Sequence, residues 1–533
     1  MPISSSSTPV PGAEATTHAQ NQTDVFAVHG ADPEVLAYAM AKYSRSSLSM
    51  RQSLREISSQ KAEQFLNTFY FQYGHRSIAD LAHVAFAIER LSLLAAIILV
   101  DEQRWDGQER STRYQNFLKS GWYLPDFGHE SATQALYTKT VEDLFSAYAR
   151  TSAAVFNALK SRVPCPAEMK QDAYERTLKA RAFDVARYLL PLATNTSLGQ
   201  IVNARTLETQ ISRLLSHPAA EIRDLGAKLR EAATGPAWNL NADGLAALQE
   251  KIAALSPGLG AESEPILVRE VRSAPTLVKY AQPNLYEQHT GGDLSRANAE
   301  LFANIPIAPM PMVDLVERTE SLEVELASTL LYSVGHHSYR QIRDLVAELP
   351  EARTAEIIDL GLQHRGRHDE LLRAFHAGAA LRFDILMDVG GFRDMHRHRR
   401  CTQIIQEFTH LHGYDTPESG DAAGLAEAGI LAEYQASVEA AFAASRRIAQ
   451  SGAPEAAQSA LYLLPLATRI RALFKMDFAE AVYISELRSG PAGHFSYRKV
   501  AWEMYLAVER QHPSLARYFR VTDFTEPIDI LKR

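Results

Sequence analysis

Apolar residues recur every three or four positions through most of this chain. Three long stretches, residues 140–159, 173–190 and 425–450, keep this spacing, which predicts amphipathic helices that each bury one face. Leu381 to Asp388 alternates apolar and polar residues instead, a pattern typical of a half-buried strand. With only one or two strands expected in each half, the sequence predicts a helix-rich α+β fold.

One heptapeptide occurs twice. Tyr188 to Thr194 and Tyr462 to Thr468 both read Tyr-Leu-Leu-Pro-Leu-Ala-Thr, and the copies lie 274 residues apart, about half of the chain. Seven identical residues at this separation indicate the duplication of a whole domain rather than a short repeat. A helical segment that carries arginines is expected after each copy, as far as Arg223 in the first and Arg498 in the second.

Other segments align around this repeat. The stretch from His83 aligns with the stretch from Ala380. The residues after Asp24 resemble those after Val313, and both read as a short strand that leads into a helix. We therefore predict two homologous domains, residues 24–260 and 310–533, here called the first and second halves.

Connecting and terminal segments have a different composition. The predicted linker, residues 261–309, lies between Pro257-Gly-Leu-Gly and a proline-rich run at 305–312. Residues 1–23 are rich in Ser, Thr, Pro and Ala. They lack the basic start and apolar core of a signal peptide, so a disordered tail is expected.

Composition limits the class of protein. Of the 533 residues, 46% are hydrophobic and 22% are charged, which is normal for a globular protein. The net charge of −8 argues against nucleic acid as a general partner but leaves room for a local basic site. Two cysteines, Cys165 and Cys401, are too few for a disulfide framework. The longest apolar run, Leu91 to Val100, is half a membrane span. A soluble, cytoplasmic protein is expected.

The candidate chemistry is concentrated in Arg393 to Arg400, where four arginines and two histidines fall within eight residues. Arginine is always charged and presents a planar fork of donors, so such a cluster needs an anion or open water. The cluster follows the predicted strand after Gly390-Gly391, where a phosphate would reach several donors together. A solvated basic surface or a nucleic-acid patch are the alternatives.

Arg397-His398-Arg399 resembles the start of the signature of the flavin-dependent thymidylate synthase (ThyX) family, which is Arg-His-Arg, seven residues and then Ser. The resemblance extends over nearly all of both halves, but neither half holds the complete set. In the first half, Asp101-Glu102-Gln103 stands in place of Arg-His-Arg. Leu214 stands in place of the family's last arginine, and Arg213 is one position short.

The losses in the two halves are complementary. The second half keeps Arg397-His398-Arg399 and Arg488 but has Glu407 at the serine position and Leu461 at the position of Arg187. The elements that only the first half keeps are Gly74-His75-Arg76-Ser77, Gln108 to Tyr114, Arg187 and Asn203-Ala-Arg205. Because family members build their sites between subunits, we predict one composite pocket per chain and an inactive twin.

The resemblance implies an enzyme that reductively methylates dUMP with methylenetetrahydrofolate and NADPH, with FAD as cofactor. It implies nucleotide binding by Ser111, Arg113, Arg187, Arg397 and Arg488, of which Ser111 and Arg488 are the catalytic candidates. For FAD it implies His75, Ser77, Glu109, Asn203, Arg205, Arg397, His398 and Arg399. A homodimer of fused chains would replace the family's homotetramer.

Alternatives remain open at this point. The chain could be a flavoenzyme of the same fold that acts on another pyrimidine nucleotide, or a non-catalytic homologue that binds nucleotide or flavin. No metal site is predicted, because His368 and His376 have no carboxylate or cysteine at ligand spacing. Neither a membrane nor nucleic acid is expected as a partner.

Overall fold

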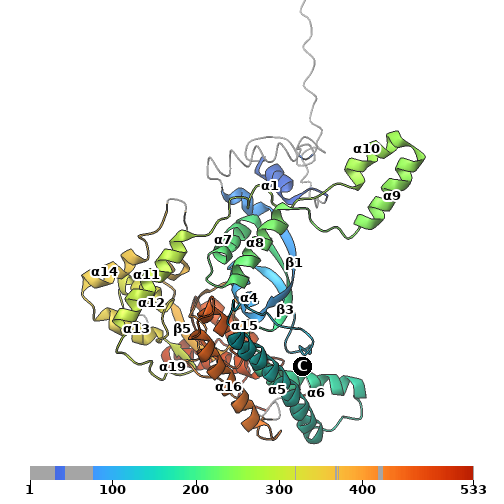
Figure 1. The fold of residues 1–533 in the computed structure, drawn as a ribbon. Helices are drawn as coiled ribbons and strands as arrows, with labels where there is room; N and C mark the ends of the chain where they lie inside the picture. The colour runs from blue at the N-terminus through green and yellow to red at the C-terminus, as the bar shows by residue number, and fades with distance from the viewer. Residues whose placement is uncertain are drawn as a thin grey trace, which may run out of the picture.

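The computed structural model describes residues 30–42, 54, 76–317, 320–366, 369, 371–417, 424–527 and 529–531. The predicted tail, the strand after Asp24, and the side chains of His75 and His368 lie outside these ranges. The two halves lie against each other, and a single apolar cluster contains residues of both (Figure 1).

The first half and the linker contain α1 (Pro33–Lys42), η3 (Arg76–Leu81), β1 (His83–Ser92), α4 (Leu93–Leu99), β2 (Asp106–Glu109), α5 (Ser131–Arg162), α6 (Gln171–Ala186), η4 (Arg187–Leu189), β3 (Asn195–Asn203), α7 (Ala204–Leu215), α8 (Ala220–Thr234), α9 (Ala242–Leu255), α10 (Pro257–Leu267) and α11 (Leu285–Leu301). The second half contains β4 (Val313–Leu315), α12 (Leu322–Tyr332), α13 (Tyr339–Ala347), α14 (Glu351–Leu360), η5 (Arg373–Phe375), β5 (Leu381–Asp388), α15 (Val389–Met395), β6 (Thr402–Ile405), α16 (Leu431–Ala449), α17 (Ala456–Leu461), β7 (Arg469–Met476), α18 (Phe478–Ser489), α19 (Phe495–Gln511) and α20 (Pro513–Ala516).

Each half has one antiparallel sheet, with strand order β1-β3-β2 in the first and β4-β5-β7-β6 in the second. Val84 of β1 pairs with Val202 of β3, and Leu381 of β5 pairs with Met476 of β7. Val202 and Met476 are 274 residues apart, the same separation as the repeat. β1 holds one extra residue, Arg90, at a bulge where its φ is +61°. The equivalence of β1 and β5 that the alignment predicted is confirmed.

The three predicted long helices are present as α5, α6 and α16. The expectation of one or two strands per half was wrong, because the described residues form three strands in the first half and four in the second. The segment after each repeat also begins with a strand, β3 or β7, before its helices. The short alternations within these strands are hidden among longer helical patterns, which explains why they were missed.

β5 is a strand as predicted, but it is buried on both faces rather than on one. Its polar residues point into a buried ionic network on the face covered by α12 and α13. There Arg382 pairs with Glu320, Asp384 pairs with Arg471 at 3.0 Å, and Lys475 pairs with Glu325 at 3.0 Å. The apolar/polar alternation separated the two faces of the strand correctly. It did not reveal that the polar face is buried, because charged side chains that are paired can occupy a buried face.

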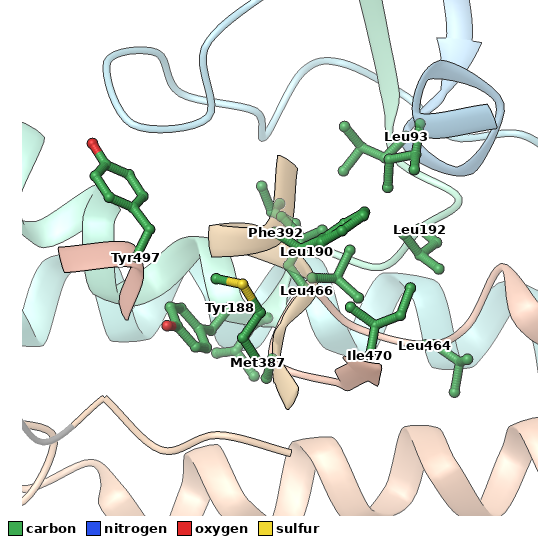
Figure 2. Packing of buried hydrophobic residues seen from close by; sticks show 14 of the residues in the cluster. Leu93, Tyr188, Leu190, Leu192, Met387, Phe392, Leu464, Leu466, Ile470 and Tyr497 are labelled. Atoms are coloured by element: carbon green, nitrogen blue, oxygen red, sulfur yellow. The ribbon is translucent and has the colours of Figure 1, made fainter. Parts of the chain in front are cut away.

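The two heptapeptides lie against each other around an approximate twofold axis. Leu192 N donates to Leu464 O at 2.9 Å, and Leu466 N donates to Leu190 O at 2.9 Å. Figure 2 shows these four leucines within one cluster of buried side chains. Such reciprocal bonding is the signature of a contact between equivalent surfaces, so the repeat itself forms the centre of the seam between the halves.

The predicted linker contains the end of α10 and the whole of α11, and α11 packs on α12 and α14. The hairpin of α9 and α10 extends away from the rest of the molecule (Figure 1). Within the described ranges, no helix combines the length and apolar character needed to cross a membrane.

Candidate functional site

Both halves build the same corner at the end of their first long strand. β1 leads into α4 through the N-cap Ser92, and β5 leads into α15 through the N-cap Asp388. The Ser92 hydroxyl donates to Glu221 of α8 at 2.7 Å, whereas Asp388 accepts from the hydroxyl of Ser496 of α19. The two caps therefore use a hydroxyl–carboxylate pair in opposite order. Burial raises the pKa of Asp388 to about 6, and the nearby charge of Asp415 acts in the same direction.

A pocket opens where the two corners meet. Its empty volume is about 360 Å³, part of it open to solvent. The first half lines it with α4, β2 and the loop between them, and the second half with α15 and the residues that follow. The lining residues are Ile97, Val100, Trp105, Gly107, Glu109, Arg393, His396, Arg397 and Arg399. Arg397 and Arg399 of the predicted cluster thus lie opposite the first half, as the composite-site prediction requires.

One wall of this composite pocket is formed by an arginine stacked on a tryptophan. The Arg399 guanidinium lies over the Trp105 ring, 5.4 Å from its centroid. Burial lowers the pKa of Arg399 to about 10, although the Asp101 carboxylate acts in the opposite direction. A Cβ at Gly107 would lie only 2.6 Å from the Trp105 ring, so glycine is needed there. Arg397 is exposed at the pocket.

The loop that carries the predicted serine connects directly to the basic cluster. Glu109 pairs with Arg393, and Thr112 Oγ accepts from Arg393 Nη1 at 3.4 Å. Thr112 Oγ also accepts from Arg187 Nη1 at 3.3 Å. Ser111 Oγ accepts from the backbone N–H of Arg113 at 3.2 Å and is partly exposed. Ser111, Arg187 and the helix before Arg397 are thereby brought together across the seam.

Arg187 is almost completely buried, with 2% of its surface exposed. Its Nε and Nη2 atoms have no hydrogen-bond partner among the described residues, and the same holds for Nε of Arg393. Buried donors without partners are costly. Arg187 and Arg393 therefore each have guanidinium donors that the described protein groups leave unused.

Arg113 also crosses the seam. Its Nε donates to Asp184 at 2.8 Å, its Nη1 donates to the hydroxyl of Tyr497 at 2.9 Å, and its Nη2 donates to the carbonyl of Ala492 at 3.3 Å. Tyr497 lies between two arginines, because the Arg488 guanidinium is 5.4 Å from its ring centroid. The predicted pair Arg113 and Arg488, from opposite halves, is thus joined through one tyrosine.

Arg488 is held by the second residue of the Arg-His-Arg element. Arg488 Nε donates to Nε2 of His398 at 2.8 Å. Burial lowers the pKa of His398 to about 3, and the charges of Arg488 and Arg399 act in the same direction. Because a neutral imidazole accepts this bond, the positive charge of Arg488 is not cancelled. His398 is buried and does not line the composite pocket, so it positions Arg488 instead.

The second corner, where Asp101, Glu102 and Gln103 take the places of Arg397, His398 and Arg399, is here called the twin corner. Charge pairs occupy it. Asp101 takes the place of Arg397 and pairs with Arg373, and Gln403 takes the place of Gly107 and bonds His396 Nδ1 at 2.8 Å. Burial opposes ionisation of Asp101, but Arg373, His396 and Arg213 outweigh it and lower its pKa. An internal ion pair thus fills the position that is open in the composite pocket.

The twin corner also neutralises its arginine. Arg213, the counterpart one position short of Arg488, donates to Glu102 at 2.7 Å, and Glu102 takes the place of His398. The counterparts of Trp105 and Arg399 are Cys401 and Gln103, which cannot form a stacked pair. The twin corner therefore lacks the features that make the composite pocket suited to an anion.

Several residues predicted to bind FAD lie outside the composite pocket. Asn203 is the N-cap of α7 and accepts from Thr206 N at 2.8 Å. Arg205 pairs with Asp80 at 3.4 Å, and Ser77 is exposed on η3. The lining of the composite pocket does not include any of these three residues. The single chain thus brings together the predicted substrate residues but not the whole predicted cofactor set.

Trp105, Tyr497, Asp184 and Thr112 were not among the predicted site residues, and Arg393 was predicted only as part of the basic cluster. Arg393 lies on α15, which ends before Arg397, and both residues line the composite pocket. Thr112 lay within the quoted motif. The signal for Trp105, Asp184 and Tyr497 is tertiary, since each acts on a residue from a distant segment.

Comparison with known proteins decides the family. A family model described as "Thymidylate synthase complementing protein" matches residues 27–235 and 315–514. The chain belongs to this family. The two matched segments are tandem ThyX-like domains, so the resemblance, the duplication and the helix-rich α+β fold are confirmed.

Two relatives share the full tandem length. A "UPF0159 protein" from Chlamydia muridarum is 28% identical over 529 residues, covering 93% of this chain and 91% of the relative. "UPF0159 protein Ta1429" from Thermoplasma acidophilum is 25% identical over 521 residues, covering 91% of this chain and 94% of the relative. The arrangement of two ThyX-like halves is therefore shared with other chains.

Single-domain members of the family are also similar. A "Flavin-dependent thymidylate synthase" from Clostridium tetani is 25% identical over 177 residues, covering 33% of this chain and 67% of its own length. The solved structure of ThyX from Helicobacter pylori, complexed with FAD and dUMP, is 17% identical with a TM-score of 0.25. It covers 38% of this chain and 89% of its own.

Proposed function

We propose that this protein is a flavin-dependent thymidylate synthase-like enzyme that methylates dUMP, using methylenetetrahydrofolate and NADPH, with one active site per chain at the seam. The observation that carries the proposal is the convergence at the seam of arginines from both halves. Arg187 and Arg393 share Thr112, while Arg113 and Arg488 share Tyr497. Family membership gives this convergence its chemical interpretation.

The nucleotide would be held from both sides of the seam. A phosphate requires guanidinium forks and a hydroxyl, and the spare donors of Arg187, the neighbouring Arg113 and the Ser111 hydroxyl supply them. Uracil becomes nucleophilic at C5 when negative charge on its carbonyl is stabilised, and a fixed, uncancelled guanidinium does this. Arg488, held by neutral His398, has that character.

The side chains of the composite pocket have the chemistry to contact part of a flavin nucleotide. The Trp105–Arg399 stack offers a flat apolar and cationic surface, the exposed Arg397 offers charge for a pyrophosphate, and the buried Arg393 Nε is an unused donor. FAD, when bound, supplies the redox chemistry of the reaction. The chain itself would orient it, with Arg397 and Arg399 facing its anionic part and Glu109 fixing Arg393.

Ser77, Asn203 and Arg205 suggest a second chain. They do not line the composite pocket, so in a homodimer they would serve a cofactor that is bound mainly by the partner. Size-exclusion chromatography with light scattering tests this, because a strictly monomeric chain at micromolar concentration would exclude it.

Two measurements test the proposed function. Purified protein should be yellow, with flavin absorbance close to one FAD per chain. It should also release tritium from C5-labelled dUMP when methylenetetrahydrofolate and NADPH are supplied. A yellow protein without tritium release would favour another pyrimidine nucleotide as substrate. A colourless protein that also fails to bind added FAD would refute the enzyme and leave the non-catalytic alternative.

A further inference from the structure

The C-terminal segment, residues 519–531, lies outside the residues that match the family model, which end at 514. We call it the C-terminal strap. It starts at Phe519, which packs between Phe478 and Tyr505 with ring centroids 5.7 Å from each. Val521, Ile530 and Leu531 pack on the apolar cluster that contains residues of both halves. The described residues of the strap, 519–527 and 529–531, thus pack at the seam.

One end of the strap supports the turn that carries Arg488. Thr522 N donates to Ser489 Oγ at 3.0 Å, and Arg520 N donates to Glu486 at 2.8 Å. The Phe524 ring lies 5.5 Å from the Arg498 guanidinium, whose Nε donates to the carbonyl of Ser489 at 3.0 Å. Ser489 directly follows Arg488 and is 1% exposed. The strap therefore fixes this turn from outside the site.

The other end reaches the first half. The carbonyl of Ile530 accepts from Nε of Arg181 on α6 at 3.1 Å. Asp184 lies three residues further along α6, so both side chains share one helical face. Asp184 is the carboxylate that holds Arg113. The strap thus joins the support of Arg488 in one half to the support of Arg113 in the other.

We propose that the C-terminal strap is a positioning element of the nucleotide site, which sets the relative placement of Arg488 and Arg113 across the seam. This inference rests on the proposed function only in naming dUMP as the ligand. Among the described residues, the hydrogen bonds of the strap reach supports of these arginines, and none of the residues that they reach lines the composite pocket. Loosening it should therefore weaken nucleotide binding and leave FAD binding unchanged.

The test uses Thr522→Pro in the full-length chain, because proline lacks the N–H that Ser489 accepts. The matched control is Thr522→Ala, which keeps that N–H. We expect the Kd for dUMP to rise roughly tenfold in the proline variant, to stay within about twofold in the alanine variant, and the Kd for FAD to stay unchanged in both. Hydrogen exchange should increase at residues 486–493 only in the proline variant.

A second pair cuts the other anchor. Arg181→Leu should weaken dUMP binding and increase exchange at residues 180–186, whereas Arg176→Leu, at an exposed position on the same helix, should change neither. Faster exchange with unchanged dUMP affinity in both test variants would overturn the proposal. If the wild-type chain binds no dUMP, the proposed function fails, and the strap is judged by exchange alone. Unchanged exchange at residues 486–493 then overturns it.

Discussion

The composite pocket and the twin corner are built from equivalent positions that carry different side chains. Two positions of the Arg-His-Arg element have acidic counterparts that are paired with arginines. Arg397 corresponds to Asp101, which is paired with Arg373, and His398 corresponds to Glu102, which is paired with Arg213. At the equivalent sites of Arg488 and Arg213, the comparison teaches that the acceptor matters: neutral His398 leaves the charge of Arg488 in place, whereas Glu102 neutralises Arg213.

The largest effect is expected from Arg187→Ala. Its loss removes a nearly buried guanidinium with unused donors from the seam, so dUMP affinity should fall by at least about 100-fold. Leu461 is the counterpart at the equivalent repeat position, and Leu461→Ala should leave affinity within about twofold. Isothermal titration of both variants measures the difference. Similar losses in the two variants would show that the halves contribute alike.

His398→Glu should give Arg488 the same kind of partner that Arg213 has in the twin corner. A carboxylate at this position would pair with Arg488 as Glu102 pairs with Arg213, so we expect dUMP affinity to fall by about 10- to 100-fold. His398→Gln is the matched control, because a neutral amide oxygen still accepts from Arg488 Nε. Equal affinities of the two variants would contradict the role given to the neutral acceptor.

Acid should destabilise the protein through three buried histidines, whereas Asp388 opposes this loss, because its raised pKa of about 6 lets the folded chain take up a proton there. Burial lowers the pKa values of His396 to about 4 and of His398 and His412 to about 3, from 6.5. Below pH 6.5 the unfolded chain takes up protons that the folded chain does not, so stability falls as the pH drops towards 3–4. Each histidine should contribute about 2 kcal/mol of loss between pH 6.5 and 5.

Denaturant unfolding at pH 7 and pH 5 measures this loss, and His396→Gln should reduce it by the share of one histidine. His396 and His398 have no histidine counterpart in the first half, where Val100 and Glu102 occupy these positions. A His396→Gln variant that loses as much stability between pH 7 and pH 5 as the wild-type chain would mean that His396 is not held neutral.

The smallest effect is expected from a substitution in the twin corner. Arg373→Leu leaves the partly buried Asp101 without its main partner, so the free energy of unfolding should fall by about 1–2 kcal/mol. Nucleotide affinity should not change, because Arg373 donates to Asp101 and to the carbonyl of Gln403, and neither residue is proposed to hold the nucleotide. Urea unfolding and titration of the same sample separate the two outcomes, and a large loss of affinity would show that the corners are coupled.

Much of this organisation was predictable from sequence, because the repeated heptapeptide fixed the alignment of the halves. That alignment predicted which elements each half had kept, and the structure brings Ser111, Arg113 and Arg187 to the same seam as Arg397 and Arg488. The position of His398 behind Arg488, rather than in the pocket, could not be predicted, because burial depends on the packing of α18. The fully buried β5 was missed for the same reason, since its paired charges resemble an exposed face.

The opposite order of hydroxyl and carboxylate at the two caps has an evolutionary consequence. In an assembly of identical subunits, one gene encodes both sides of a symmetric contact. A substitution therefore occurs on both sides and must be compatible with its own copy. Here Ser92–Glu221 and Asp388–Ser496 are encoded separately, and each can mutate without its mirror image. Tandem fusion thus allows two equivalent surfaces to acquire different side chains.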